Sequence, residues 1–248
     1  MTLTRLTETA ADTDSVYADI SWPDAPTGRP YVYVNMASTA DGKIVIGTAH
    51  GSAKGVGGAT DQLLFRRLQL QADAVIVGAV TLRASQVIYP SQKPRFTVTR
   101  SGDIPTSNRF FTDAPDKAHI FVPGSLDEHV CSRLAAETGA AVLPCGTTDV
   151  DIPRALGIIR NQFGAKSLLC EGGSVLNEQL FRLGLVDELF LTLAPRIKGG
   201  AHLPTPVGGA GFEPGKYASL QLLSVYRDED ELYLRYRVVP QQSEGTQQ

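Results

Sequence analysis

The sequence predicts a three-layer α/β domain whose mixed sheet is mainly parallel and ends in antiparallel strands. Two observations predict this fold class. Short apolar runs typical of buried strands alternate with helical patterns between residues 31 and 183, as in the βαβ units of a parallel sheet. After residue 187 the helical patterns stop and alternating strands follow, which indicates an antiparallel end to the sheet.

The strands of the parallel part are short and rich in apolar and β-branched residues. The runs AVIVG and LLC are apolar at every residue, which is typical of strands buried on both faces. We expect strands at residues 31–38, 73–78, 95–100, 118–122, 140–144 and 166–170.

Apolar stripes and capping residues identify the helices between these strands. In residues 60–71, Leu64 and Leu68 share one face, and Thr60 is the expected N-cap. A second helical stripe consists of Ile152, Leu156, Ile159 and Phe163. Each stripe predicts a helix with one apolar face.

Residues 125–139 carry the start and stop signals of a further helix. Ser125 and Glu128 have the spacing of a capping box, and Gly139 is a usual residue just after a helix. The helix is therefore expected to begin at Ser125 and to end at Gly139.

The last part of the chain contains the expected antiparallel strands. Residues 187–195 alternate, and residues 219–239 predict a hairpin with its turn near residues 228–230. The apolar faces of these strands carry Leu189, Leu191 and Leu193, and Leu232, Leu234, Tyr236 and Val238. Such faces fit either the core or a subunit interface.

Residues 30–240 are expected to form one domain between two polar ends. Residues 1–29 end in a segment rich in proline and glycine, which disfavours regular structure. We expect an N-terminal extension that lies over the domain surface or on a partner subunit. Residues 241–248 predict a disordered tail.

The composition excludes several classes of function. The chain is 42% hydrophobic and 20% charged, which is ordinary for a globular protein. A net charge of −3 gives no basic footprint for nucleic acid. No apolar stretch is long enough to span a membrane, and the N-terminus lacks the apolar run of a signal peptide. The three cysteines form no C-x-x-C pair, so we expect reduced thiols in a cytoplasmic protein.

The sequence Glu171-Gly172-Gly173-Ser174 stands between an expected strand and an expected helix at residues 174–183. The glycines let the backbone turn sharply and approach a ligand closely, and Ser174 is a suitable N-cap. The backbone N–H groups of the first turn, together with the helix dipole, suit a pyrophosphate. Glu171 then points towards donors on a substrate or on a neighbouring strand. A plain strand-to-helix turn is the alternative.

Two further turns follow expected strands. Gly78 ends one strand and Thr81 lies at the next helix start, and the alternative is again a tight turn. Arg100 and Ser101 follow another strand, where an arginine can bind a 2′-phosphate, although a surface arginine is the alternative. Because all three turns lie at carboxyl ends of strands, together they favour one dinucleotide cleft.

The stretch NMASTADGK carries polar residues in and after the first strand. Asp41-Gly42 is a frequent turn pair, and Asn35 or Asp41 could instead anchor a substrate ring. The four histidines lack metal-ligand spacing, and no zinc-deaminase, P-loop or G-x-S-x-G motif is present. Hydride transfer needs none of these, because the cofactor carries the chemistry. We therefore expect no metal.

Three stretches together resemble the riboflavin-biosynthesis pyrimidine reductases. They are MASTADGKI, ADAVIVGAVT, and residues 168–200, which contain E-G-G-x-x-L-N, G-L-V-D-E-L and A-P-x-x-x-G-G. The resemblance covers about residues 30–239. It implies a dihydrofolate reductase-like fold, NADPH as cofactor, and a homodimer. The family includes the reductase half of a bifunctional deaminase–reductase, and this sequence has no deaminase motif, so a stand-alone reductase is expected.

The resemblance also implies roles for individual residues. On the substrate side would lie Asn35, Asp41 and Glu171. On the cofactor side would lie Gly78, Thr81, Thr99, Arg100, Ser101, Gly172, Gly173, Ser174, Val175 and Leu176. Asp41 or an ordered water would support the proton transfer, so Asp41 is the expected catalytic residue.

The sequence departs from the family pattern at two positions that would hold the substrate. Family members carry D-D-P-x-L-T-V-R after the V-G-x-x-T stretch, whereas this chain has LRASQVIYPSQKP. Gln69 takes the place of a frequent arginine before A-D-A-I. Both departures remove expected anchors for a ribose 5′-phosphate.

The expected function is therefore an NADPH-dependent reductase of a small heterocyclic substrate. It resembles the 5-amino-6-ribosylaminopyrimidinone 5′-phosphate reductase of riboflavin biosynthesis. The missing anchors motivate one alternative, a dihydrofolate or pterin reductase that uses the same cleft. A non-catalytic NADP-binding protein is the alternative from another class.

Overall fold

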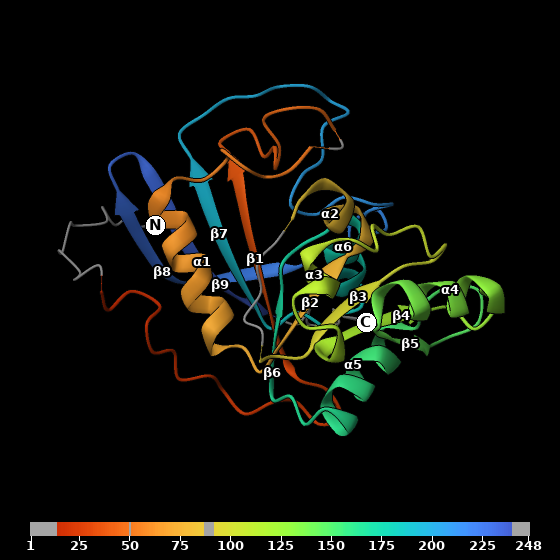
Figure 1. The fold of residues 1–248 in the computed structure, drawn as a ribbon. Helices are drawn as coiled ribbons and strands as arrows, with labels where there is room; N and C mark the ends of the chain where they lie inside the picture. The colour runs from red at the N-terminus through yellow and green to blue at the C-terminus, as the bar shows by residue number, and fades with distance from the viewer. Residues whose placement is uncertain (1–13, 50, 87–91, 240–248) are drawn as a thin grey trace, which may run out of the picture.

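A computed structural model describes residues 14–49, 51–86 and 92–239. Its strands are β1 Tyr31–Thr39, β2 Ala74–Gly78, β3 Arg95–Val98, β4 Ala118–Val122, β5 Ala141–Pro144, β6 Ser167–Cys170, β7 Glu188–Ala194, β8 Ser219–Asp228 and β9 Glu231–Val239. Within the described residues they form one sheet in the order β5-β4-β3-β2-β6-β1-β7-β9-β8 (Figure 1). Only the pairs of β9 with β7 and β8 are antiparallel. The expected mixed sheet is confirmed.

Helices cover both faces of this sheet. They are α1 Ala59–Gln71, α2 Ala79–Ala84, α3 Arg109–Thr112, α4 Glu128–Thr138, α5 Ile152–Gln162 and α6 Ser174–Arg182, with a short 3-10 helix at Pro115–Lys117. Buried side chains of α1 to α4 pack in one core cluster, and those of α5 and α6 pack in another on the opposite face. The three expected layers are therefore present.

The expected N-caps Thr60 and Ser125 are wrong. Thr60 lies inside α1, and its hydroxyl donates to Asp228 Oδ2 of the terminal hairpin at 2.5 Å. Asp127 caps α4 in place of Ser125, because its carboxylate accepts the backbone N–H two residues further on. The expected end of α4 is confirmed, since Gly139 has the left-handed φ of +67°.

The described part of the N-terminal extension, residues 14–29, lies over this chain's own sheet. The ring of Trp22 stacks on Tyr33 of β1, with centroids 4.2 Å apart. Arg29 forms a bidentate pair with Asp187, at 2.6 and 2.8 Å. These contacts correspond to an extension that lies over the surface of its own domain, which is one of the two expected positions. The expected tail at residues 241–248 lies outside the described residues.

The parallel register places the carboxyl ends of three central strands at one edge. Cys170 at the end of β6 pairs with Val34 of β1 and Ile76 of β2. The Gly78 N–H donates to the Gly172 carbonyl at 3.0 Å, so the turns after β2 and β6 touch. The loops after β1 and β7 lie together beyond this edge, at the top of Figure 1. Ligands of open α/β sheets bind at such an edge.

Candidate active site

A cavity of about 750 Å³ opens at this edge, between α1, α2, the start of α6 and the loop after β1. Its volume lies in the usual range for small-molecule sites. Five residues expected from the sequence line it: Asn35, Thr81, Glu171, Gly173 and Ser174. The structure thus brings members of the expected substrate and cofactor sides around one space.

The glycines of the turn after β6 are required first by the chain's own packing. Gly172 and Gly173 have φ of +88° and +100°. A Cβ on Gly173 would lie 3.0 Å from the Gly78 Cα, and one on Gly172 would lie 2.7 Å from the Met36 Sδ. The plain structural explanation therefore accounts for the glycine pair, and Gly173 in addition faces the cavity.

Ser174 is not the N-cap of α6. Gly173 occupies that position without a side-chain cap, and the Ser174 hydroxyl donates to the Thr205 carbonyl at 2.6 Å. Asn177 Nδ2 donates to the Pro206 carbonyl at 2.8 Å. The side chains of the first turn are thus drawn towards the loop after β7. The first backbone N–H groups of a helix have no acceptor within it, and Gly173 and Ser174, where α6 begins, line the cavity.

The other seven residues expected on the cofactor side lie outside the cavity lining. They are Gly78, Thr99, Arg100, Ser101, Gly172, Val175 and Leu176. Arg100 is exposed and pairs with Asp149 at 3.1 Å, while Leu176 is 4% exposed and belongs to the core. The Thr99 hydroxyl accepts the Gly102 N–H at 3.1 Å. The turn after β3 is therefore ordered by its own contacts.

Glu171 lies in the cavity wall at the end of β6. Gln69 of α1, which replaces the frequent family arginine, donates from Nε2 to Glu171 Oε1 at 2.7 Å. Gln69 is 4% exposed, and the contact is partly buried in the cavity wall. A neutral amide thus orients the Glu171 carboxylate. Such a carboxylate suits the amino groups of a heterocycle.

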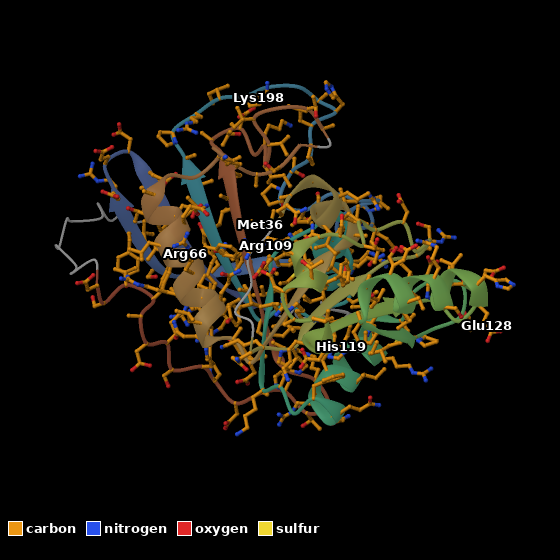
Figure 2. The ribbon with its side chains drawn as sticks, in the orientation of Figure 1. Met36, Arg66, Arg109, His119, Glu128 and Lys198 are labelled. Carbon is orange, nitrogen blue, oxygen red and sulfur yellow. The ribbon has the colours of Figure 1, made fainter. Side chains whose placement is uncertain are left out.

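Asp41 is not part of the cavity lining. Its carboxylate accepts the Thr39 hydroxyl at 2.6 Å and the N–H groups of Lys198 and Gly199 at 2.9 and 2.7 Å. These hydrogen bonds, that of Thr39 first, lower the pKa of Asp41 from 3.8 to about 2. Asp41 thus joins the loop after β1 to the loop that carries Lys198, and Figure 2 labels Lys198 in that loop. An anion with this pKa is unsuited to donate a proton at neutral pH.

Three charged residues in the cavity lining were missed by the sequence reasoning: Lys54, Asp61 and Arg66. Lys54 and Arg66 are exposed, and Figure 2 shows Arg66 on α1. Asp61 is only 5% exposed. An acidic residue in a first helical turn and an arginine further along a helix are common surface features. Their sequence context therefore carried no signal of a site.

Residues 14–49, 51–86 and 92–239 contain neither a metal-ligand cluster nor a membrane-spanning helix. No group of three or more histidine, cysteine or acidic side chains could hold a metal ion there. No helix in those ranges is long and apolar enough to cross a membrane. Cys145 and Cys170 are buried and Cys131 is partly buried, all as free thiols.

Comparison with known proteins gives consistent matches in sequence. A family model described as the RibD C-terminal domain matches residues 30–234. The 2,5-diamino-6-ribosylamino-4(3H)-pyrimidinone 5′-phosphate reductase of Methanothermobacter thermautotrophicus is 33% identical over 224 residues, which cover 85% of this chain and 99% of that protein. The riboflavin biosynthesis protein RibD of Actinobacillus pleuropneumoniae is 28% identical over 222 residues, 86% of this chain, but the match spans only 58% of its length.

Solved structures show the same fold at lower identity. A pyrimidine reductase-like protein from Corynebacterium diphtheriae superposes with a TM-score of 0.73 at 21% identity, over 92% of this chain and 99% of that one. The RibD of Acinetobacter baumannii gives a TM-score of 0.70 at 21% identity, over 86% of this chain and 59% of that one. The architecture described above is therefore shared with these proteins.

Proposed function

Because the chain belongs to the RibD C-terminal domain family, we propose that it reduces a ribosylaminopyrimidinone 5′-phosphate with NADPH. It is an oxidoreductase, since its relatives are named reductases of riboflavin biosynthesis. One observation supports the proposal above the others. A carboxylate, Glu171, and the N-terminus of α6 line the same cavity. The Glu171 carboxylate suits amino groups on a pyrimidinone, and the N-terminus of α6 suits a phosphate.

Reductases of this family and fold generally bind a nicotinamide cofactor, which supplies a hydride when it is bound. The residues around the cavity fit such a group. Gly173 presents backbone without a side chain, the first turn of α6 presents N–H groups, and Thr81 offers a hydroxyl on the facing α2. We propose that these three features hold the pyrophosphate. NADPH as the specific form is part of the same proposal.

Lys54 and Arg66 are proposed to bind the substrate phosphate in place of the missing family anchors. Both line the cavity, and neither forms an ion pair within the described part of the chain. We expect Arg66→Gln to raise the KM for the phosphorylated substrate roughly 10- to 100-fold, because a charge-assisted hydrogen bond is worth about 1.5–3 kcal/mol. The KM for the dephosphorylated substrate should change little. Steady-state kinetics with both substrates measures the difference.

The matched control is Arg154→Gln, an exposed arginine of α5 on the other face of the sheet. It should leave both KM values at the wild-type level. An equal rise in KM for the two substrates in Arg66→Gln would contradict the proposed phosphate contact.

The function itself is tested by NADPH oxidation with two substrates in parallel. Turnover of the ribosylaminopyrimidinone 5′-phosphate supports the proposal. Turnover of dihydrofolate alone would instead support the alternative, a dihydrofolate or pterin reductase. Tight NADPH binding without turnover of either would indicate a non-catalytic NADP-binding protein.

A homodimer is also proposed, with the terminal hairpin as its interface. The edge strand β8 exposes 42% of Leu220 and 47% of Leu222, and the preceding Tyr217 is 64% exposed. A second copy that covers these side chains would remove apolar surface from water. Sedimentation over a concentration series should give the mass of a dimer, and a monomer at every concentration would contradict the proposal.

A further inference from the structure

Asp61 is a buried carboxyl group that the functions assigned above do not use. It lies in the first turn of α1, is 5% exposed, and lines the large cavity. It also lines a small adjoining pocket together with Asn35, Thr192 and Tyr233. Asp61 and Asn35 of β1, an expected substrate contact, thus line the same two spaces.

The surrounding chain is built to leave room for this carboxyl group. A Cβ on Gly57 would lie 2.3 Å from Asp61 Oδ2, so only glycine fits there without a shift of Asp61. Gln62 Nε2 donates to Oδ2 at 3.0 Å, and the Thr192 hydroxyl forms a further hydrogen bond. Asp61 is thus oriented by neutral groups, which do not force it to remain ionised.

The electrostatic surroundings favour the protonated form of Asp61. Burial raises its pKa above 3.8, and the nearby Glu231 carboxylate raises it further, whereas the hydrogen bonds from Thr192 and Gln62 lower it. Charged and titratable groups of the packed elements also line these spaces or lie near Asp61. They are Tyr17 of the N-terminal segment, Glu231 and Tyr233 on β9, Glu171 after β6, Lys54 in the loop before α1, and Arg66 on α1. Asp61 is therefore buried with a raised pKa, whereas Asp41 is accessible with a lowered pKa.

The proposed reaction needs a proton donor in the cavity that Asp61 lines. When the sugar C1′ accepts a hydride, either the π bond of a C1′=N imine or the C1′–O bond of the ring breaks. The nitrogen or oxygen that takes the electron pair then needs one proton. We infer that Asp61 is the catalytic residue that donates this proton, and this inference rests on the proposed function. Asp61 is left as a carboxylate and takes a proton from solvent before the next turnover.

The test compares Asp61→Asn with Asp228→Asn, a matched control. Asp228 also contacts the first turn of α1, but from outside the cavity. In the wild type, kcat should fall as pH rises through the pKa of Asp61, since only the protonated group donates. Asp61→Asn should lose roughly 10²- to 10⁴-fold in kcat, with KM near the wild-type value and without this pH dependence. Asp61→Glu should recover part of the rate, and Asp228→Asn should keep both rate and profile.

Thermal unfolding separates this role from a structural one. A buried carboxylate becomes less favourable as pH rises above its unfolded pKa, so Asp61→Asn should unfold no earlier than the wild type at neutral pH. If the wild type turns over the substrate and Asp61→Asn has the same kcat and pH profile, the inference is overturned, while the proposed function stands. A wild-type protein that does not turn over the ribosylaminopyrimidinone 5′-phosphate would overturn the proposed function and, with it, the inference.

Discussion

Gly173→Ala is expected to destabilise the protein by about 3 kcal/mol and to weaken binding of the cofactor. At φ +100° and ψ +103° the backbone of Gly173 lies in a region that costs a residue with a Cβ about 1–3 kcal/mol. The added Cβ would also lie 3.0 Å from the Gly78 Cα, which is backbone and cannot rotate away. Urea unfolding measures the stability, and a fluorescence titration with NADPH measures the binding.

The matched control for this substitution is Gly211→Ala. Gly211 has φ of +79°, but its Cβ would meet nothing within 4 Å. It should lose only the cost of the left-handed backbone, about 1 kcal/mol, and should bind NADPH normally. If Gly173→Ala and Gly211→Ala lose equal stability, the close contact between the turns after β2 and β6 does not make Gly173 intolerant of a Cβ.

Arg235→Met is expected to destabilise the protein by about 3–5 kcal/mol, because it leaves the buried carboxylate of Glu188 without its cation. Arg235 Nε and Nη2 donate to the two Glu188 oxygens at 2.7 and 3.1 Å, and the Glu188 side chain is 1% exposed. The Tyr31 hydroxyl donates to the same carboxylate at 2.9 Å. The guanidinium also lies 5.8 Å from the centre of the Trp22 ring. One cation thus joins β9, β7 and the N-terminal segment.

The comparison for Arg235→Met is Arg133→Met, which removes an exposed pair with Glu137 on α4. A surface pair is worth about 0–1 kcal/mol, so this variant should remain close to the wild type in urea unfolding. The double variant Arg235→Met with Glu188→Gln should recover part of the loss, since no buried charge then remains. A loss in Arg235→Met as small as that in Arg133→Met would show that water reaches Glu188.

The elements of the fold could be predicted well from the sequence, because their signals are local. The apolar run before Gly78 predicts β2, and the stripe that includes Leu64 and Leu68 predicts α1. The caps were predicted less well. Thr60 and Ser174 have suitable side chains at helix starts, but each hydroxyl finds an acceptor in a distant segment. A cap competes with such partners, and the sequence does not show them.

The candidate site was predicted only in part, because contacts with distant segments decide which of the predicted residues line the cavity. Glu171 and Gly173 follow a buried strand, and the carboxyl ends of parallel strands meet in a common region. Asp41 follows a strand in the same way, yet its partners in the loop at residues 198–199 hold it outside the cavity lining. Arg100 follows β3 and pairs with Asp149 instead of lining the cavity.

The sequence by itself determined the order of the strands and of the longer helices, the change from parallel to antiparallel pairing, and the glycine turn with its carboxylate. It did not predict the short helices at Arg109–Thr112 and Pro115–Lys117. Periodicity and turn chemistry act over a few residues, so they can be read along the chain. Only the tertiary structure decided which polar groups share the cavity. Asp61 is identified only from the structure, because folding buries it in the lining of a pocket shared with Asn35, 26 positions away in sequence numbering. Burial and the resulting shift in pKa depend on the elements that pack around a residue, and no local pattern encodes them.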